Sequence, residues 1–120
     1  MIEFLELEAY RNKMIAGLPY GVRKVVEIGR ALALGPKLIL LDEPVAGVNP
    51  TLGVEIADRI KALVREDGLT FLIVEHDMDI ISQLCDHIVV MANGTDLMEG
   101  NFEEVMSSHA VQDAYLGKRA

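Results

Sequence analysis

The chain has 120 residues, which is the size of one domain or of part of one. Hydrophobic residues make up 51% of it, enough for a packed core and too many for a disordered chain. The formal net charge of -8 argues against a nucleic-acid-binding surface, and a single cysteine excludes an internal disulfide framework.

Neither the cysteine nor the hydropathy suggests a secreted or membrane-spanning protein. Cys85 has apolar neighbours, so we expect it to pack as a small buried hydrophobe rather than to react as a thiol. No run of about 18 apolar residues occurs, so membrane association is expected only through a partner.

The first predicted element is a helix over residues 22–34. We expect its buried face to consist of Val25, Val26, Leu32 and Ala33.

A strand, a helix and a second strand are predicted next. Residues 38–41 and 70–74 are continuous apolar runs, which is typical of parallel strands that are buried on both faces. Between them, Asn49 can cap a helix, Pro50 suits its first position and Gly68 can end it. One apolar stripe along this helix is formed by Leu52, Ile56, Ile60, Leu63 and Val64. The segment therefore predicts a βαβ unit.

A short helix and a hairpin follow. Asp77 can cap a helix that runs to Leu84, and residues 87–91 predict a strand. Asn93-Gly94 is a strong hairpin-turn signal because both central residues of that turn need a positive φ. The second arm is expected over residues 95–99.

The chain closes with a predicted helix that runs to about Leu116. Asn101 and Glu104 have the spacing of a reciprocal helix cap. Strands and helices are mixed along the whole chain without an internal repeat, so the fold class is α/β.

The clearest chemical signal is a pair of acids, Asp42 and Glu43, at the end of the first apolar run and directly before Pro44. Open parallel sheets bind ligands at the carboxyl ends of their strands. Asp42 could hold a magnesium ion there, and Glu43 could orient or deprotonate an attacking water. The alternative is that Asp42 only caps the next segment.

This acidic strand end resembles the Walker B motif of ATP-binding-cassette (ABC) ATPases, and three further motifs agree in order and spacing. Residues 18–22, Leu-Pro-Tyr-Gly-Val, stand where that family has its signature sequence. Residues 46–50 resemble the loop that touches the opposite subunit, and residues 74–78 resemble the switch-histidine region. The resemblance covers essentially the whole chain.

The resemblance implies a role for each motif. Tyr20, Gly21 and Val22 would approach the γ-phosphate held by a second ATPase subunit, because a glycine at a helix start lets backbone N–H groups reach an anion. Gly21 could instead be a plain helix-start glycine. His76 would donate a hydrogen bond to the γ-phosphate, or else be a structural histidine. The residues that the resemblance implies would contact the second subunit are Gly47, Val48 and Asn49.

Some residues depart from the common family pattern. Pro19 replaces the signature serine, Val22 replaces glutamine, and Asn49 stands where many relatives have aspartate. Pro-Tyr-Gly at 19–21, Glu-His-Asp-Met at 75–78 and Ala-Tyr-Leu-Gly at 114–117 look like the ATPase subunits of branched-chain amino-acid importers. The transported substrate is not encoded in these motifs.

A phosphate-cradling loop needs Gly-x-x-x-x-Gly-Lys followed by Ser or Thr, and these 120 residues contain none. We therefore expect the C-terminal half of a P-loop ABC ATPase domain, with the signature-motif part in residues 1–35 and the Walker B, switch-histidine and hairpin parts in residues 36–120. The complete domain would use ATP and Mg²⁺. The fragment alone is expected to be inactive.

The resemblance also places a Walker A strand, absent here, between the strand at 70–74 and the strand at 87–91. We expect the freed strand edge to pair with something else, most simply a second copy of the chain.

The leading hypothesis is an energy-coupling ATPase that works with a second ATPase subunit and with permease subunits, on the inner face of the cell membrane. The runner-up is a non-enzymatic remnant or self-associating assembly module. An unrelated doubly wound domain, such as a flavodoxin-like receiver, would need an acidic site near its first strand, and the first 35 residues offer none.

Overall fold

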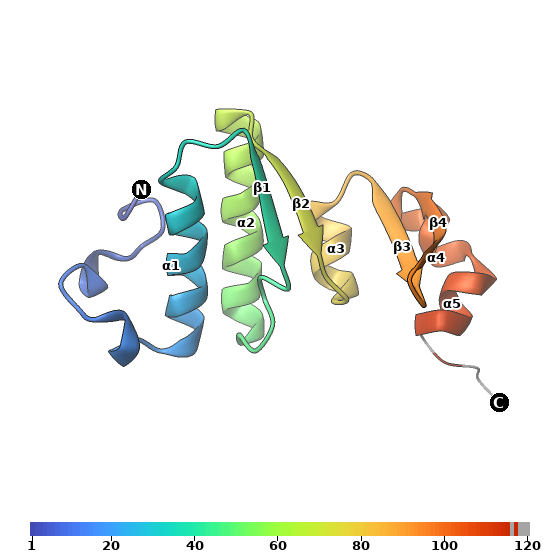
Figure 1. Cartoon of the computed structure of the whole chain (residues 1–120), viewed down its shortest axis with the longest axis horizontal. Helices are drawn as coiled ribbons and strands as arrows, with labels where there is room; N and C mark the ends of the chain where they lie inside the picture. The colour runs from blue at the N-terminus through green and yellow to red at the C-terminus, as the bar shows by residue number, and fades with distance from the viewer. Residues whose placement is uncertain (116, 118–120) are drawn as a thin grey trace. The chain divides into compact units, whose positions relative to one another are not determined.

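The computed structural model describes residues 1–115 and 117 and divides into two compact units, Met1–Ile80 and Ile81–Ala120. The first unit contains, in chain order, η1 (Glu8–Tyr10), η2 (Ile15–Gly17), α1 (Tyr20–Leu32), β1 (Leu38–Asp42), α2 (Pro50–Asp67) and β2 (Thr70–Val74), shown in Figure 1. Helix α3 (Met78–Leu84) contains the boundary. The second unit contains β3 (Ile88–Ala92), β4 (Thr95–Gly100), α4 (Phe102–Ser107) and α5 (His109–Tyr115).

The predicted βαβ unit is confirmed. Strands β1 and β2 pair in parallel, with Leu40 opposite Leu72, and α2 connects them. The helix begins as expected, since the Asn49 side chain accepts a hydrogen bond from Leu52 N–H at 2.9 Å and Pro50 is the first helical residue. It ends at Gly68, which adopts a left-handed backbone conformation (φ 65°) that glycine tolerates without a steric penalty.

The core of the first unit lies between α2 and one face of this sheet. Ile56, Ile60 and Leu63 of α2 are buried, as is Ile39 of β1. Val64, which the sequence pattern placed on the same stripe, is 42% exposed, so that assignment was wrong.

Helix α1 begins two residues earlier and ends two residues earlier than predicted. Its buried residues are Val25, Ile28, Gly29 and Leu32. The prediction missed Ile28 and Gly29 and included Ala33, which is exposed. Gly29 is buried because the Leu5 side chain lies against it: a Cβ there would be 2.8 Å from Leu5 Cδ1.

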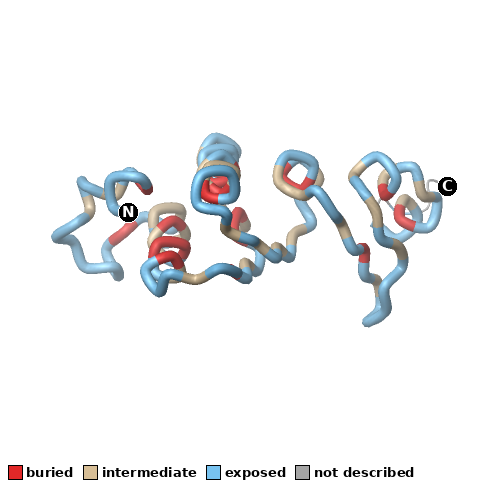
Figure 2. Tube along the Cα trace, turned by 90° about the horizontal axis from the view of Figure 1, so that it is seen from above, coloured by how far each residue is buried: buried red, intermediate tan, exposed pale blue. Residues whose placement is uncertain are grey.

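The opposite face of the β1–β2 sheet is exposed within the described residues of this unit, contrary to the expectation that both faces are buried. Exposed residues alternate with buried or half-buried ones along both strands, which the tube in Figure 2 colours by burial. We call this surface the bare face; it is formed by Leu38, Leu40, Leu72 and Val74. Leu40 is 67% exposed and Leu72 is 61% exposed. A run of apolar residues predicts a strand, but it does not supply the element that covers the strand.

Strand β2 also has an unpaired edge in the described part of the chain, since its sheet contains only β1 and β2. Thr70 N–H donates to Lys37 O (2.9 Å), and Val74 O accepts from Glu43 N–H (2.8 Å), so both residues point toward β1. Backbone groups alternate in direction along a strand, so those of Phe71 and Ile73 point to the other edge. This is a template for another strand.

The second unit is an antiparallel hairpin with two short helices. Strands β3 and β4 join at Asn93-Gly94, both with positive φ (52° and 78°), which confirms the predicted turn. The reciprocal cap is also confirmed: Asn101 Oδ1 accepts from Glu104 N–H, and Glu104 Oε2 accepts from Asn101 N–H, both at 2.9 Å.

The expected single C-terminal helix is interrupted at Ser108, which is extended (φ -75°, ψ 122°) and separates α4 from α5. The break lets both helices bury an apolar residue with the hairpin: Val105 and Val111 cluster with Val90. Leu116, where the helix was expected to end, lies outside the described residues. None of the helices among residues 1–115 combines the length and apolarity needed to cross a membrane.

Candidate functional site

The two parallel strands bring the segments that follow them close together. Asp42 and Val74 are in register at the ends of β1 and β2. Glu43, the next residue, has its N–H bonded to Val74 O at 2.8 Å. Its backbone is left-handed (φ 48°), a conformation that costs a non-glycine residue about 1–2 kcal/mol. Such strain occurs often at functional sites.

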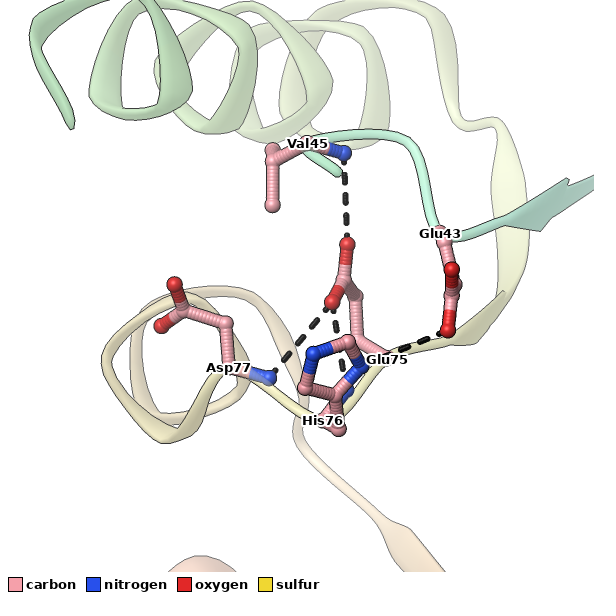
Figure 3. A network of polar contacts seen from close by, with 5 residues as sticks. All are labelled: Glu43, Val45, Glu75, His76 and Asp77. Carbon is pink, nitrogen blue, oxygen red and sulfur yellow. Dashed lines mark hydrogen bonds and ion pairs between the residues drawn. The ribbon is translucent and has the colours of Figure 1, made fainter. Parts of the chain in front are cut away.

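Glu43 and His76 meet at this edge of the sheet. His76 Nδ1 lies 3.3 Å from Glu43 Oε1, and the side chains are 70% and 50% exposed respectively (Figure 3). Neither group is sealed in the interior, so both can reach a bound molecule. A carboxylate and an imidazole in contact are a pair suited to proton transfer and to orienting a polar ligand.

Asp42 stands beside this pair without a described contact to it. Its place in β1 puts it on the same side as Leu40, and its side chain is exposed. It lines a hollow of about 190 Å³ with α1 residues that include Lys24 and Glu27. This volume is below the roughly 300–1,000 Å³ of sites that enclose a drug-sized ligand, so the hollow does not enclose a nucleotide.

The carboxylates here could hold a magnesium ion only together with water and substrate phosphate ligands, not as a site made of protein groups alone. In the described residues no three His, Cys, Asp or Glu side chains group as a metal-binding cluster. Mg²⁺ is usually held by one or two carboxylates together with waters and substrate phosphates. Asp42, exposed at a strand end, fits that requirement.

One residue at this site was missed by sequence reasoning. Glu75 follows β2 directly, and its Oε1 accepts from Val45 N–H at 3.2 Å. Its Oε2 accepts from His76 N–H at 3.1 Å and lies 3.5 Å from Asp77 N (Figure 3). Nothing in the sequence signals this contact, because its partners are backbone groups.

The signature-like residues Tyr20, Gly21 and Val22 form the first turn of α1. The helix bonding begins with Arg23 N–H, which donates to Pro19 O at 3.1 Å, and Pro19 provides no side-chain cap. The N–H groups of the first turn are therefore available to an acceptor, and the helix dipole favours an anion there. Arg23 also places its guanidinium 5.7 Å from the centre of the Tyr20 ring.

Close packing gives the two glycines near this turn a structural role as well. A Cβ on Gly21 would overlap Leu52 Cδ2 of α2. Gly47 has a positive φ (72°), and a Cβ there would lie 2.9 Å from Tyr20 Cε1. The contact joins the signature-like turn to the loop of Gly47, Val48 and Asn49. The plain structural explanation of Gly21 therefore has direct support, alongside the phosphate-binding one.

Cys85 and His87 belong to the second unit. Cys85 is half-buried rather than buried as expected. This partial burial, and secondarily the charge of Asp86, raises the pKa of its thiol, as expected of an unreactive cysteine. His87 Nε2 lies 3.2 Å from Glu99 Oε2 in the hairpin.

No protein-family model matches the chain. The chain is 42% identical over 122 residues to a probable branched-chain amino acid transport ATP-binding protein, LivG, of Methanocaldococcus jannaschii; the match covers 98% of this chain and 47% of the relative. It is 40% identical over 117 residues to the Archaeoglobus fulgidus protein of the same name, with 98% and 45% covered. The chain thus spans about half the length of these curated relatives.

Solved structures show the same relationship. The crystal structure of an ATP-binding cassette of an ABC transporter in its ADP conformation matches with a TM-score of 0.86 at 40% identity, over 98% of this chain and 47% of that one.

Proposed function

The chain is homologous to the C-terminal half of the ATPase domain of ABC transporters, and from this relationship we propose that it carries the water-activating and phosphate-sensing residues of an ATP-hydrolysing importer subunit. The relatives' names favour branched-chain amino acids as the cargo of the assembled transporter.

The observation that best supports this proposal is the contact between His76 and Glu43. Their 3.3 Å separation joins two segments that are 33 positions apart and that leave the sheet at the same edge. Two accessible polar groups of complementary chemistry at parallel strand ends are the expected arrangement for a ligand-binding edge.

Each residue has a proposed task. Asp42 holds Mg²⁺ directly or through water. Glu43 accepts a proton from the attacking water or orients it, and His76 donates a hydrogen bond to the γ-phosphate. Phosphoryl transfer depends mainly on positioning and charge stabilisation, so these groups need a correctly held triphosphate to act.

The triphosphate would be held by residues outside these 120. The chain lacks the Gly-x-x-x-x-Gly-Lys loop, and its hollow beside Asp42 is too small for a nucleotide. In the assembled transporter we propose that Tyr20, Gly21 and Val22 approach the phosphate bound by a second ATPase subunit, which Gly47, Val48 and Asn49 also contact.

The remaining partners in this proposal are permease subunits, which would keep the ATPase at the inner, cytoplasmic face of the cell membrane. Nucleic acid is not among the proposed partners, because the net charge of -8 disfavours binding to a polyanion.

A chimaera tests the proposal directly. The missing half would come from the Methanocaldococcus jannaschii relative, joined to this chain at the aligned position. We expect Mg²⁺-dependent ATP hydrolysis, and we expect Glu43→Gln to reduce turnover at least about a hundredfold while ATP binding persists. Glu55→Gln, an exposed charge change on α2, is the control. Full turnover by the Glu43→Gln chimaera would refute the role of Glu43.

The 120-residue chain itself gives the complementary test. Calorimetric titration with Mg²⁺-ATP should detect no binding in the micromolar range. Micromolar affinity would contradict our explanation of what the phosphate loop supplies.

A second candidate function is self-association without ATP turnover, and the bare face and the unpaired β2 edge favour it. Size-exclusion chromatography with light scattering should show a dimer or larger species whose population increases with concentration. Leu72→Lys should disrupt it, because a lysine on the bare face opposes strand and face pairing. Val64→Lys, an equally apolar-to-charged change on α2, should not. A monomer at all concentrations would eliminate this candidate.

A further inference from the structure

Glu75 forms a side-chain hydrogen bond that reaches from the segment after β2 to a backbone group of the segment after β1. Its two carboxylate oxygens have different partners. Oε1 accepts from Val45 N–H at 3.2 Å, and Oε2 accepts from His76 N–H at 3.1 Å. Val45 is buried, so its end of the contact is shielded from water.

Glu43 is consequently held on both sides. Its own N–H donates to Val74 O at 2.8 Å, and Val45, two residues later, donates to Glu75. The residue between these ties keeps a left-handed backbone (φ 48°), which an unconstrained glutamate rarely adopts. These two hydrogen bonds together fix the backbone of Glu43, and so they fix where its side chain begins.

His76 is held by the same carboxylate, through its own N–H. One side chain therefore ties both backbone segments whose side chains meet 3.3 Å apart. We propose that Glu75 is a positioning residue for the Glu43–His76 pair. This inference builds on the function proposed for that pair, but it concerns only how the pair is arranged.

The chemistry at position 75 requires a carboxylate. Val45, His76 and, at a longer 3.5 Å, Asp77 all present N–H donors to it, and a carboxylate can accept on each oxygen. Glutamine has one acceptor oxygen, so it can keep one tie, while its amide group would face the donor of the other. Glu75→Gln removes one tie with little change of shape, and Glu75→Ala removes both.

NMR of the 120-residue chain tests the ties first. A through-hydrogen-bond coupling between the Val45 amide nitrogen and the Glu75 carboxyl carbon should be present in the parent chain. Glu75→Ala should abolish it and accelerate hydrogen exchange of the Val45 amide about tenfold or more, since hydrogen bonds to charged acceptors are among the stronger ones. Glu55→Gln, which removes an equal charge on α2, should change neither.

The second measurement asks whether the ties position the pair. Glu43→Gln should change the ¹⁵N shift of the His76 ring in the parent chain, because it alters the group facing Nδ1. In the Glu75→Ala background that response should fall to less than about half, because both ties are lost. In the Glu75→Gln background, which keeps one tie, the response should fall by a smaller amount. A dispersed amide spectrum is required as evidence that each variant is folded. If Glu75→Ala does not fold, the comparison is made with Glu75→Gln alone.

Two results would overturn the inference. Without the Val45 coupling in the parent chain, the tie does not exist. With an undiminished His76 response in both Glu75 backgrounds, Glu75 stabilises the loops without positioning the pair. No ATP is used, so a failure here is distinct from a failure of hydrolysis in the chimaera.

Discussion

The contact between Gly47 and Tyr20 gives a stability change that can be estimated from the structure. We consider Gly47→Ala. An alanine at φ 72° costs about 1–2 kcal/mol in backbone strain. Its Cβ would also lie 2.9 Å from Tyr20 Cε1. Overpacking typically costs about 1–3 kcal/mol, and the lower end applies because Tyr20 is 48% exposed and can swing outward. The expected total is about 2–3 kcal/mol.

Gly35→Ala is the matched control, because Gly35 has a similar φ (63°) with nothing within 4 Å of an added Cβ. Both substitutions gain similarly from a less flexible unfolded chain, so this effect cancels in the comparison. Urea denaturation followed by circular dichroism should show Gly47→Ala to be worse by about 1 kcal/mol.

A double-mutant cycle completes the test. In a Tyr20→Ala background, Gly47→Ala and Gly35→Ala should destabilise equally, because only the backbone term remains. Equal destabilisation already in the presence of Tyr20 would refute the contact. The signature-like turn and the loop of Gly47, Val48 and Asn49 would then not be coupled through this ring.

Three further predictions follow from caps and burial. Asn49→Ala should lower the free energy of unfolding by about 1 kcal/mol, measured by urea denaturation, through loss of the hydrogen bond from Leu52 N–H; an unchanged midpoint would contradict this. Asn101→Ala should accelerate amide exchange across residues 102–107 and leave α2 unaffected, since the cap it removes belongs to α4; uniform acceleration in both units would argue otherwise. Cys85 should react with a disulfide reagent near pH 7.5 more slowly than glutathione does and faster in urea, because burial raises its pKa and reduces the thiolate fraction; equal native rates would disagree.

The sequence was sufficient where a structural feature depends on local chemistry. Asn49 with Pro50, Asn93 with Gly94, and Asn101 with Glu104 each satisfy a backbone need within a few residues, and each was predicted correctly.

Features that depend on distant partners were not predictable in the same way. Leu40 and Leu72 are apolar whether or not another element covers them, so the bare face had no sequence signal. The break at Ser108 follows from packing of Val105 and Val111 on the hairpin, which helical periodicity does not encode.

The candidate site divides along the same line. Glu43 and His76 were identified because their residue types and places after apolar runs indicate chemistry. Glu75 accepts backbone hydrogen bonds from a residue 30 positions away, so its contribution appears only in three dimensions. The tight packing of Gly21 against Leu52 likewise required coordinates.

The positive φ at residue 43 and the carboxylate there favour different residues. Glycine adopts this backbone conformation most easily, whereas a carboxylate requires a side chain, whose Cβ makes the conformation strained. Glu43→Gly should therefore make the chain harder to unfold, by about 1 kcal/mol, even as it deletes the acid. Under the proposed role of Glu43 in activating water, this strain is the stability cost of placing a carboxylate at a position that glycine would occupy more easily.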